Sequence, residues 1–347
     1  MTIRCAINGF GRIGRTMLRR MLTDGGVEPV AVNSDRGTPE SIAHLFRYDT
    51  VFGRWPGAVE IDGTSMVVDG HPIELISNRD PAALPWHDLG IDVVAEATGR
   101  FTAHDDAAAH LRAGARKVLI TAPASGADAT LVVGVNDHLY DPDAHSIVSG
   151  ASCTTNCLAP VAAVLHERFG ILGGLVTTVH AYTRDQSLVD GTHEDPRRAR
   201  AAAQNMVPTK TGAAKAIGLV LPDLAGRLVG IAIRVPVCDV SLLDLSVVLE
   251  RTTGVEEIND AFRLAALTRP AGRIIGVCDE PLVSSDFRGD DRSCVIDAAS
   301  TRGGPGNQFK VLAWYDNEWG YASRMVDLVR LIGAPLPAGA RGRPATL

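Results

Sequence analysis

The sequence predicts an α/β protein of two domains: an open, doubly wound parallel sheet, followed by an α+β domain with a mixed, largely antiparallel sheet. Three observations support this. A short apolar run at residues 3–7 leads directly into a glycine-rich turn and a helical pattern. Short strands of the same kind then alternate with helices over the first 150 residues or so, and beyond that point the β segments become longer. This change of pattern is typical of a parallel α/β unit joined to an α+β unit.

The first βαβ unit predicts a dinucleotide-binding domain of the Rossmann type. Gly9, Gly11 and Gly14 form a G-x-G-x-x-G pattern between the first strand and a helix that continues to Gly25-Gly26. Residues 29–32 follow as the second strand. Glycines in this place let the backbone approach a pyrophosphate, and the helix N-terminus attracts its charge. The expected ligand of this domain is a dinucleotide.

The rest of this domain follows from local patterns. Thr38 as N-cap and Pro39 at the first helical position begin a helix through residue 46. Alternating segments between residues 59 and 75, broken by Asp-Gly pairs, predict hairpins. Further strands are expected at residues 91–95, 118–120 and 131–135, with a helix at 105–113.

One cysteine stands where a reactive thiol would be placed. The apolar run at residues 146–148 gives way to a helix beginning at Cys153, among small and hydroxylated neighbours. Helix N–H groups there favour the thiolate. The run at residues 175–179 ends at His180, as a strand carrying a base would. Taken alone, the cysteine is equally consistent with a small buried hydrophobe, and the histidine with a structural residue.

The second domain is expected to contain a helix at residues 255–267, and a last helix is expected at residues 318–331. Its strands are predicted at residues 174–180, 229–235, 240–249, 294–297 and 309–315. The resulting division is a dinucleotide-binding domain at residues 1–152, a catalytic domain at 153–317, a helix at 318–332 and a mobile tail at 333–347, which is rich in Gly, Ala and Pro.

Composition excludes several classes of function. The 347 residues are 46% hydrophobic and 21% charged, and the longest apolar runs are too short to span a membrane. The chain enters its first strand without a signal-peptide pattern, so we expect a cytoplasmic protein. Six cysteines without regular spacing indicate reduced thiols, and neither they nor their neighbours suggest a metal site. The net charge of −6 argues against nucleic-acid or membrane partners.

Three motifs identify a known family. Residues 152–157 (SCTTNC), 180–183 (HAYT) and 314–320 (WYDNEWG) resemble phosphorylating glyceraldehyde-3-phosphate dehydrogenases, and the similarity runs from about Thr2 to Ile332. The resemblance implies a homotetramer that oxidises D-glyceraldehyde 3-phosphate with inorganic phosphate to 1,3-bisphosphoglycerate, in glycolysis or gluconeogenesis. It implies a hemithioacetal and a thioester on Cys153, with His180 as base, and a last helix folded back onto the first domain.

The resemblance also implies the binding residues. Those for the coenzyme are Gly9, Gly11, Arg12, Ile13, Gly14, Ser34, Arg79, Thr121, Thr192 and Asn317, the last bonding the nicotinamide amide. Those for the substrate phosphate are Thr183 and Arg234; those for inorganic phosphate are Ser152, Thr154, Thr211 and Gly212, with Arg198 between the two pockets.

Several positions depart from the family. Where NAD-preferring members carry an Asp after the Asn of the second strand, this chain has Asn33-Ser34, with Asp35 one place later. The usual Leu-Pro of a loop from the neighbouring subunit is replaced around Thr192. These changes resemble the NADP-using branch and predict use of NADP as well as NAD, or a preference for it. Arg36 is within plausible reach of a 2′-phosphate, but Asp35 can instead take the vacant acidic role.

Other departures are Gly150 in place of Asn, Thr121 in place of Ser, and Cys238-Asp239 in place of Pro-Asn. Three alternatives stay open at this point. An erythrose-4-phosphate dehydrogenase would release the free acid, but that family generally lacks the Thr and Thr-Gly present here. A thiol hydrolase would leave the glycine loop unexplained. A non-catalytic dinucleotide-binding paralogue would keep the fold without a reactive Cys153.

Overall fold

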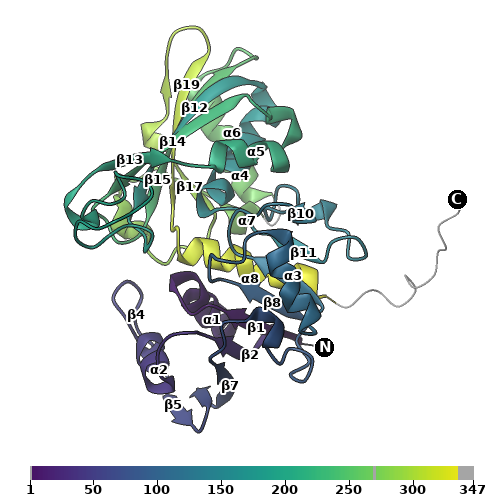
Figure 1. The fold of residues 1–347 in the computed structure, drawn as a ribbon. Coiled ribbons are helices and arrows are strands. Elements are labelled where there is room, and N and C mark those ends of the chain that lie inside the picture. The colour runs from purple at the N-terminus through teal and green to yellow at the C-terminus, as the bar shows by residue number, and fades with distance from the viewer. Residues whose placement is uncertain (1, 269–270, 335–347) are drawn as a thin grey trace, which may run out of the picture.

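The computed structural model describes residues 2–268 and 271–334, which form two large sheets with helices packed on them (Figure 1). The first sheet has the strand order β10-β11-β9-β8-β1-β2-β7-β6-β5. Its strands are β1 (Ile3–Asn8), β2 (Val27–Asn33), β5 (Val59–Asp62), β6 (Ser65–Val68), β7 (His71–Ile76), β8 (Val93–Glu96), β9 (Lys117–Ile120), β10 (Ala129–Thr130) and β11 (Ile147–Ser149). All pairs from β10 to β7 are parallel, and the ladders of β6 with β5 and β7 are antiparallel.

The prediction of a doubly wound dinucleotide-binding sheet is therefore confirmed. Its helices are α1 (Arg12–Asp24), α2 (Pro39–Arg47) and α3 (His104–Arg112), and a two-stranded ladder joins β3 (Tyr48–Asp49) to β4 (Gly53–Arg54). The Thr38 hydroxyl accepts a hydrogen bond of 3.3 Å from the Ser41 N–H, so the predicted N-cap of α2 is present.

One predicted strand is wrong. Residues 131–132 have no regular structure and residues 133–136 form a turn, and the short strand β10 lies just before them. The Asn136 side chain accepts a hydrogen bond of 2.8 Å from the Val132 N–H, and Gly134 has a φ of 80°. A side chain that satisfies the local backbone, next to a left-handed glycine, stops an apolar run from extending as a strand.

The second sheet is mixed, as predicted, with the order β13-β14-β12-β15-β19-β17-β16 and β18 beside β19. Its strands are β12 (Ile171–Ala181), β13 (Val207–Lys210), β14 (Leu228–Val235), β15 (Ser241–Leu249), β16 (Ile275–Cys278), β17 (Cys294–Asp297), β18 (Arg302–Gly303) and β19 (Gln308–Tyr315). Only β12 with β14 and β16 with β17 are parallel among these pairs in the described residues. The sequence patterns missed β13 and β16, which are four residues each.

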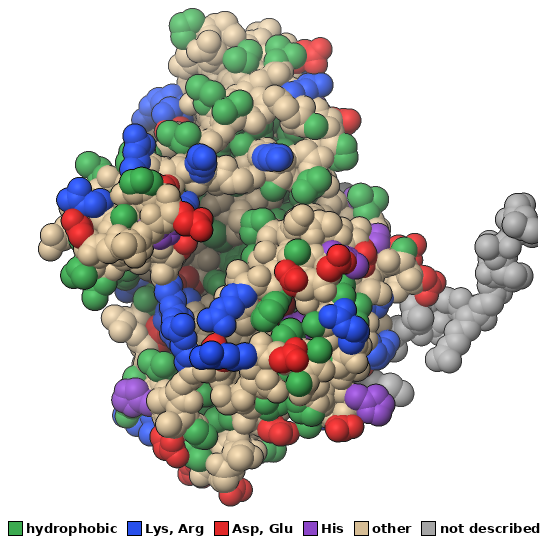
Figure 2. All heavy atoms as spheres, in the orientation of Figure 1, with side chains coloured by type: hydrophobic (Ala, Val, Ile, Leu, Met, Phe, Trp, Pro, Cys, Tyr) green, Lys and Arg blue, Asp and Glu red, His purple; other side chains and the backbone are tan. Residues whose placement is uncertain are grey.

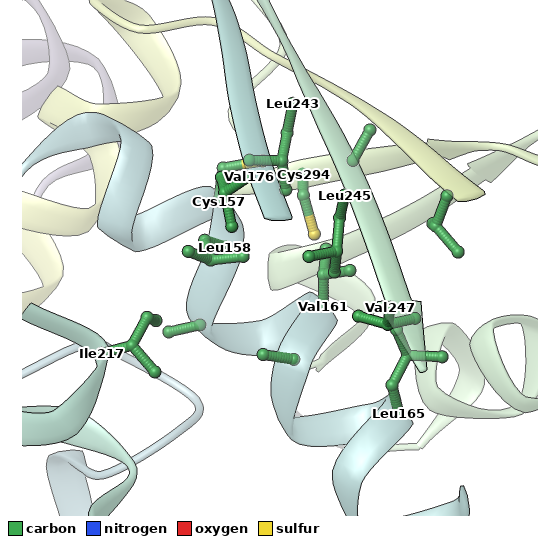
Figure 3. Close-up of a cluster of buried hydrophobic side chains, with 14 of the residues drawn as sticks. Cys157, Leu158, Val161, Leu165, Val176, Ile217, Leu243, Leu245, Val247 and Cys294 are labelled. Carbon is green, nitrogen blue, oxygen red and sulfur yellow. The ribbon is translucent and has the colours of Figure 1, made fainter. Parts of the chain in front are cut away.

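Helix α4 (Cys153–Phe169) connects the two halves of the chain and carries the second core. One face of α4 presents Cys157, Leu158, Val161 and Leu165 to apolar side chains of β12 and β15, all fully or almost fully buried (Figure 3). Helices α5 (Ala213–Val220), α6 (Val255–Leu267) and α7 (Ala271–Ile274) complete this half. Because the buried face anchors α4 along its length, the helix N-terminus is held in a fixed place.

The last helix, α8 (Trp319–Gly333), packs beside α1 although the two lie at opposite ends of the sequence (Figure 1). Its buried residues belong to the core of the first sheet. A Cβ atom at Gly150 would lie 2.3 Å from the Met325 sulfur of α8, so a larger residue there would require the Met325 side chain to move. Gly333, the first residue of the tail predicted at 333–347, belongs to α8, and residues 335–347 of that predicted tail lie outside the described residues. The division of the chain between residues 152 and 153 stays a prediction.

No helix in the described ranges has both the length and the apolar character needed to cross a membrane.

Candidate active site

Cys153 is the first residue of α4, with its sulfur directed at His180. The hydroxyl of Ser152 caps the helix by accepting a hydrogen bond of 3.0 Å from the Thr155 N–H. The Cys153 Sγ lies 3.4 Å from His180 Nε2. The strand-to-helix junction and the end of β12 thus bring together the two residues that the sequence singles out.

His180 is 3% exposed and is held through its other ring nitrogen. His180 Nδ1 lies 2.7 Å from the carbonyl oxygen of Ala181 and 2.7 Å from Nη1 of Arg234. Arg234 also donates to the Ala181 oxygen at 3.0 Å. Nδ1 can donate to the Ala181 carbonyl or accept from Arg234, but not both at once; when it donates to Ala181, Nε2 is left as an acceptor facing the sulfur. In that tautomer His180 is arranged as a base.

Burial dominates the protonation of this pair. It raises the pKa of the Cys153 thiol, although the positive charge of Arg234 and a hydrogen bond with Thr154 act in the opposite direction. It also lowers the pKa of His180 to about 3, with a further contribution from the charge of Arg234. The sequence predicted that the helix N-terminus would favour the thiolate; in this buried site the desolvation of the anion outweighs that effect. Both shifts favour a neutral thiol beside a neutral imidazole.

Tyr315 is a site residue that the sequence patterns missed. Its hydroxyl lies 2.9 Å from the Thr154 hydroxyl and 2.7 Å from that of Thr178, and its ring meets the His180 ring edge-on with centroids 6.0 Å apart. The available signal was its position directly before Asp316 in the third motif. Thr154, predicted to bind phosphate, has its hydroxyl engaged with Tyr315 here.

Asn317 is connected to the catalytic strand by hydrogen bonds. The Ser241 hydroxyl donates to Asn317 Oδ1 at 2.7 Å and accepts from the Ala181 N–H at 3.1 Å. Asn317 is 4% exposed, and its amide nitrogen remains available as a donor. Ser241, which orients this amide, was also missed by the sequence patterns.

The residues predicted for phosphate binding lie in two places: beside His180, and in the segments around Arg198 and Lys210. Arg234 lies against His180, and the charges of Arg234 and Arg198 both act on that ring. Arg198 donates to the Thr209 hydroxyl at 2.9 Å and to the Lys210 carbonyl at 3.2 Å, and pairs with Asp185. Lys210 leads into the remaining predicted residues, Thr211 and Gly212, which precede α5. Thr183 lies two residues beyond Ala181, with its carbonyl accepting from the Gln186 N–H at 3.0 Å.

A groove of about 810 Å³ runs along the carboxyl ends of the first sheet and is lined by Gly9, Gly11, Ser34 and Arg79 among the predicted residues. At Gly9, φ is 103° and a Cβ would lie 2.7 Å from the backbone of Ala97; at Gly14 a Cβ would lie 2.1 Å from the Gly9 carbonyl oxygen. Only glycine fits both positions, so the turn is as close to the sheet as a pyrophosphate cradle requires.

The other predicted coenzyme residues are placed differently. Ile13 lies in the first turn of α1, where its N–H is directed to the helix N-terminus. The Arg12 guanidinium is engaged by Glu318, at 2.8 Å, and by Asp49. Thr121 donates its hydroxyl to the Glu96 carbonyl at 3.0 Å. Thr192 is exposed and does not line the groove.

One end of the groove is rich in arginine. Arg36, Arg79 and Arg100 gather there around Asp35, next to Ser34, and Arg184 also lines the groove. Figure 2 shows Lys and Arg side chains gathered along one rim of the hollow between the two halves of the molecule. Positive charge is concentrated here on a chain whose net charge is −6.

Asp35 is held within this arginine group. Its carboxylate accepts a hydrogen bond of 3.0 Å from Arg100 and lies 3.6 Å from Arg79. The hydrogen bond from Arg100 lowers the pKa of Asp35 below its ordinary value. The Ser34 hydroxyl donates to the Arg36 carbonyl at 2.9 Å. The carboxylate next to Ser34 is therefore neutralised by arginine.

The sequence matches two family models and several known proteins over most of its length. Residues 3–104 match the model of the glyceraldehyde 3-phosphate dehydrogenase NAD binding domain, and residues 152–317 match that of the C-terminal domain. Glyceraldehyde-3-phosphate dehydrogenase 2 of Bacillus subtilis is 51% identical over 334 residues, which cover 96% of this chain and 98% of the relative. The chain belongs to the glyceraldehyde-3-phosphate dehydrogenase family.

Two further relatives agree with this assignment. Glyceraldehyde-3-phosphate dehydrogenase 2 of Streptomyces arenae is 54% identical over 97% of this chain and 100% of its own length. Glyceraldehyde-3-phosphate dehydrogenase of Geobacillus stearothermophilus is 52% identical over 96% of this chain and 99% of its own length. As a member of this family the chain is an oxidoreductase with an NAD-binding domain. Within the described residues, no group of three or more His, Cys, Asp or Glu side chains is arranged to hold a metal ion.

Proposed function

We propose that the protein oxidises D-glyceraldehyde 3-phosphate with inorganic phosphate to 1,3-bisphosphoglycerate, using NAD or NADP. The observation that carries this proposal is the 3.4 Å contact between the Cys153 sulfur and His180 Nε2, with Arg234 on the far side of the imidazole. A thiol with a base suits addition to an aldehyde, and an arginine beside it suits an anionic substrate.

Catalysis begins when the Cys153 sulfur adds to the aldehyde carbon. The thiol proton moves to His180 Nε2 and from there to the aldehyde oxygen, which gives a hemithioacetal. His180 then removes the hydroxyl proton as hydride leaves the same carbon, because loss of hydride from a neutral hemithioacetal would leave a protonated carbonyl. A thioester on Cys153 results. The nicotinamide ring, when bound, supplies the acceptor for that hydride.

Release requires a second anion at the thioester. An oxygen of hydrogen phosphate attacks the thioester carbon, the carbon–sulfur bond breaks, and His180 returns its proton to the sulfur. The proton lost by hydrogen phosphate passes to solvent. Arg198, Thr211 and Gly212 are our proposed ligands for this phosphate, with Ser152 and Thr154 at the helix N-terminus, and Arg234 and Thr183 are those for the substrate phosphate. Hydrolytic release, as in erythrose-4-phosphate dehydrogenases, would need no such second pocket.

For the coenzyme, we propose that NADP is used as well as NAD, or preferred. The Ser34 hydroxyl stands where a carboxylate would repel a 2′-phosphate, and Arg36, Arg79 and Arg100 line the same end of the groove. The ion pairs of Asp35 support this proposal, because they reduce the repulsion that its carboxylate would exert. Thr192 would contribute only from a neighbouring subunit.

We further propose a homotetramer that works in the cytoplasm. The strands β12 and β14 pair Leu175 with Val229 and Thr177 with Ile231, so these side chains share one face of the sheet. Leu175 is 66% exposed and Val229 is 64% exposed, which leaves an apolar face for a second copy of the chain. The six cysteines are all free thiols, as expected in a reducing compartment. The mass of the native particle in solution tests the assembly.

Trapping the intermediate tests the reaction. After incubation with substrate and oxidised coenzyme but no phosphate, mass spectrometry of the intact chain should show the mass of one acyl group, and peptide mapping should place it on Cys153. Addition of phosphate should remove it. An acyl group that is lost equally fast without phosphate would indicate hydrolysis, and no acyl group at all would favour a non-catalytic dinucleotide-binding protein.

A further inference from the structure

Asp239 has an unusual environment for a carboxylate. Asp239 is 1% exposed, and neither oxygen of its side chain accepts a hydrogen bond from a donor group among the described residues. The carboxylate of Asp316 lies within hydrogen-bonding reach of it. Two anions cannot bond each other, so this contact becomes favourable only when one of them carries a proton.

The surroundings decide which one carries it. Asp316 accepts hydrogen bonds from the N–H groups of Gly289 at 2.8 Å, Glu318 at 2.9 Å and Trp319 at 2.6 Å. Three backbone donors stabilise a carboxylate in its ionised form. Burial raises the pKa of Asp316 as well, but for Asp239 the adjacent Val240 N–H is the one backbone donor among the described residues that acts in the opposite direction, so the proton belongs on Asp239.

The other charged groups around the pair do not neutralise Asp239. Glu318 adds a further negative charge that acts on Asp239, and it is itself paired with Arg12 of α1, which also holds Asp49. Arg288, from the loop next to Cys238, directs its guanidinium at the Cys238 sulfur at 3.8 Å. A shared proton is therefore the available means of satisfying the pair.

We propose that Asp239 is a positioning residue: protonated, it donates a hydrogen bond to Asp316 and thereby holds Asn317 in place for the coenzyme. This inference rests on the role proposed above for Asn317, and it assigns a function to a departure of this chain, since Asp239 stands where the family commonly has Asn. An Asn would donate to Asp316 at every pH, whereas an Asp donates only while it keeps its proton.

The connection from Asp239 to Asn317 is short. The segment that carries Asp239 enters β15, and the segment that carries Asp316 leaves β19; the two strands pair at Ser241 and Tyr315. The Ser241 hydroxyl bonds Asn317 directly beyond this pair. Val240 between them has a φ of 65°, a left-handed conformation that a β-branched residue adopts only when its surroundings hold it. Repulsion between the two carboxylates acts on both segments at once.

The direction of the pKa shift of Asp239 fixes how the hydrogen bond to Asp316 depends on pH. Burial, followed by the charges of Asp316 and Glu318, raises the pKa of Asp239 to about 9, far above the ordinary value of 3.8. A raised pKa in the folded state means that the contribution of this group to stability is complete below its unfolded pKa and is lost as the pH rises through its folded pKa. The hydrogen bond to Asp316 should fail over the alkaline range near that value.

The test compares the full-length enzyme with Asp239→Asn and Asp239→Leu. From pH 7 to pH 10 the KM of the wild type for the coenzyme should rise about tenfold relative to Asp239→Asn, the loss expected for one hydrogen bond to a charged group, with kcat changed much less. Asp239→Leu should show the raised KM at every pH. Parallel KM profiles for the wild type and Asp239→Asn would overturn the proposal.

A second measurement does not depend on the coenzyme. The melting temperature of Asp239→Asn relative to the wild type should increase steadily from pH 4.5 to pH 8, because only the wild type must keep a proton on a carboxyl group. A difference that does not change with pH would mean that Asp239 is ionised when folded, which also overturns the proposal. A third variant separates this proposal from the proposed role of Asn317. If Asn317 does not bind the coenzyme, Asn317→Ala will leave the coenzyme KM unchanged, while the pH-dependent difference in melting temperature between Asp239→Asn and the wild type persists.

Discussion

The catalytic centre and the arginine-rich end of the coenzyme groove are built in opposite ways. Around Cys153 and His180 the side chains are partly or fully buried, each is held by neighbours in the same chain, and the residues match the family motifs. Around Ser34 the side chains are largely exposed, are held by ion pairs, and depart from the family. We infer that the buried centre sets the reaction, whereas the exposed end is free to change the coenzyme.

Replacing the nucleophile should have the largest effect. Cys153→Ser should lower kcat by about 10³-fold or more, because a hydroxyl is a far weaker nucleophile and no thioester forms. Cys278→Ser is the matched control, since that thiol is only partly buried and lies outside the site. Steady-state production of reduced coenzyme checks both variants. Substantial activity in Cys153→Ser would contradict the account of the buried centre.

Removing the base should have the next largest effect. His180→Gln should lower kcat by about 10²–10³-fold, the usual contribution of a positioned base. Because the pKa of His180 is lowered to about 3, its ring stays neutral from pH 5 to pH 9 and its protonation should not limit the rate in that range.

The pKa of Cys153 is raised by burial, so its thiolate fraction should increase steadily with pH. Alkylation of the wild type at Cys153 should accelerate toward alkaline pH. In Arg234→Leu the same profile should move to still higher pH, since the charge of Arg234 lowers the pKa of this thiol. Arg227→Leu, which removes an arginine bound to the Ile171 carbonyl, is the control. A rate that is already maximal at pH 6 would show that the dipole outweighs burial.

Changing the exposed end should alter coenzyme use and leave the chemistry intact. Ser34→Asp should lower kcat/KM for NADP by about 10- to 100-fold, equivalent to roughly 1–3 kcal/mol of charge repulsion, with NAD much less affected. Ser34→Asn has a similar size without the charge and serves as control. Equal losses with both coenzymes would place Ser34 outside the 2′-phosphate site.

Freeing Asp35 should give the smallest effect. Arg100→Leu removes the hydrogen bond of 3.0 Å to Asp35 and should lower kcat/KM for NADP about three- to tenfold, because an exposed ion pair contributes little. Arg116→Leu breaks a similar exposed pair with Asp92 away from the groove and should leave both coenzymes unaffected. An unchanged NADP efficiency in Arg100→Leu would show that the arginine group does not act on the phosphate.

The same contrast explains what the sequence could predict. The strand and helix patterns predicted both sheets and the approach of Cys153 to His180, because those elements have strong apolar periodicity and buried faces. The strand predicted at residues 131–135 is wrong because the Asn136 side chain satisfies the local backbone and Gly134 adopts a left-handed conformation. The protonation of Cys153 was not predictable, since it depends on burial by residues distant in the chain. The contact of Asp239 with Asp316 was not predictable either, because it joins residues that are 77 positions apart in the sequence.

The most direct test of the proposed reaction is its dependence on inorganic phosphate. Production of reduced coenzyme from glyceraldehyde 3-phosphate should be measured with NAD and with NADP, each with and without phosphate. We expect turnover that requires phosphate and yields the acyl phosphate, with NADP at least comparable to NAD. Turnover that is equally fast without phosphate and yields the free acid would contradict it, and a hundredfold preference for NAD would refute the coenzyme proposal.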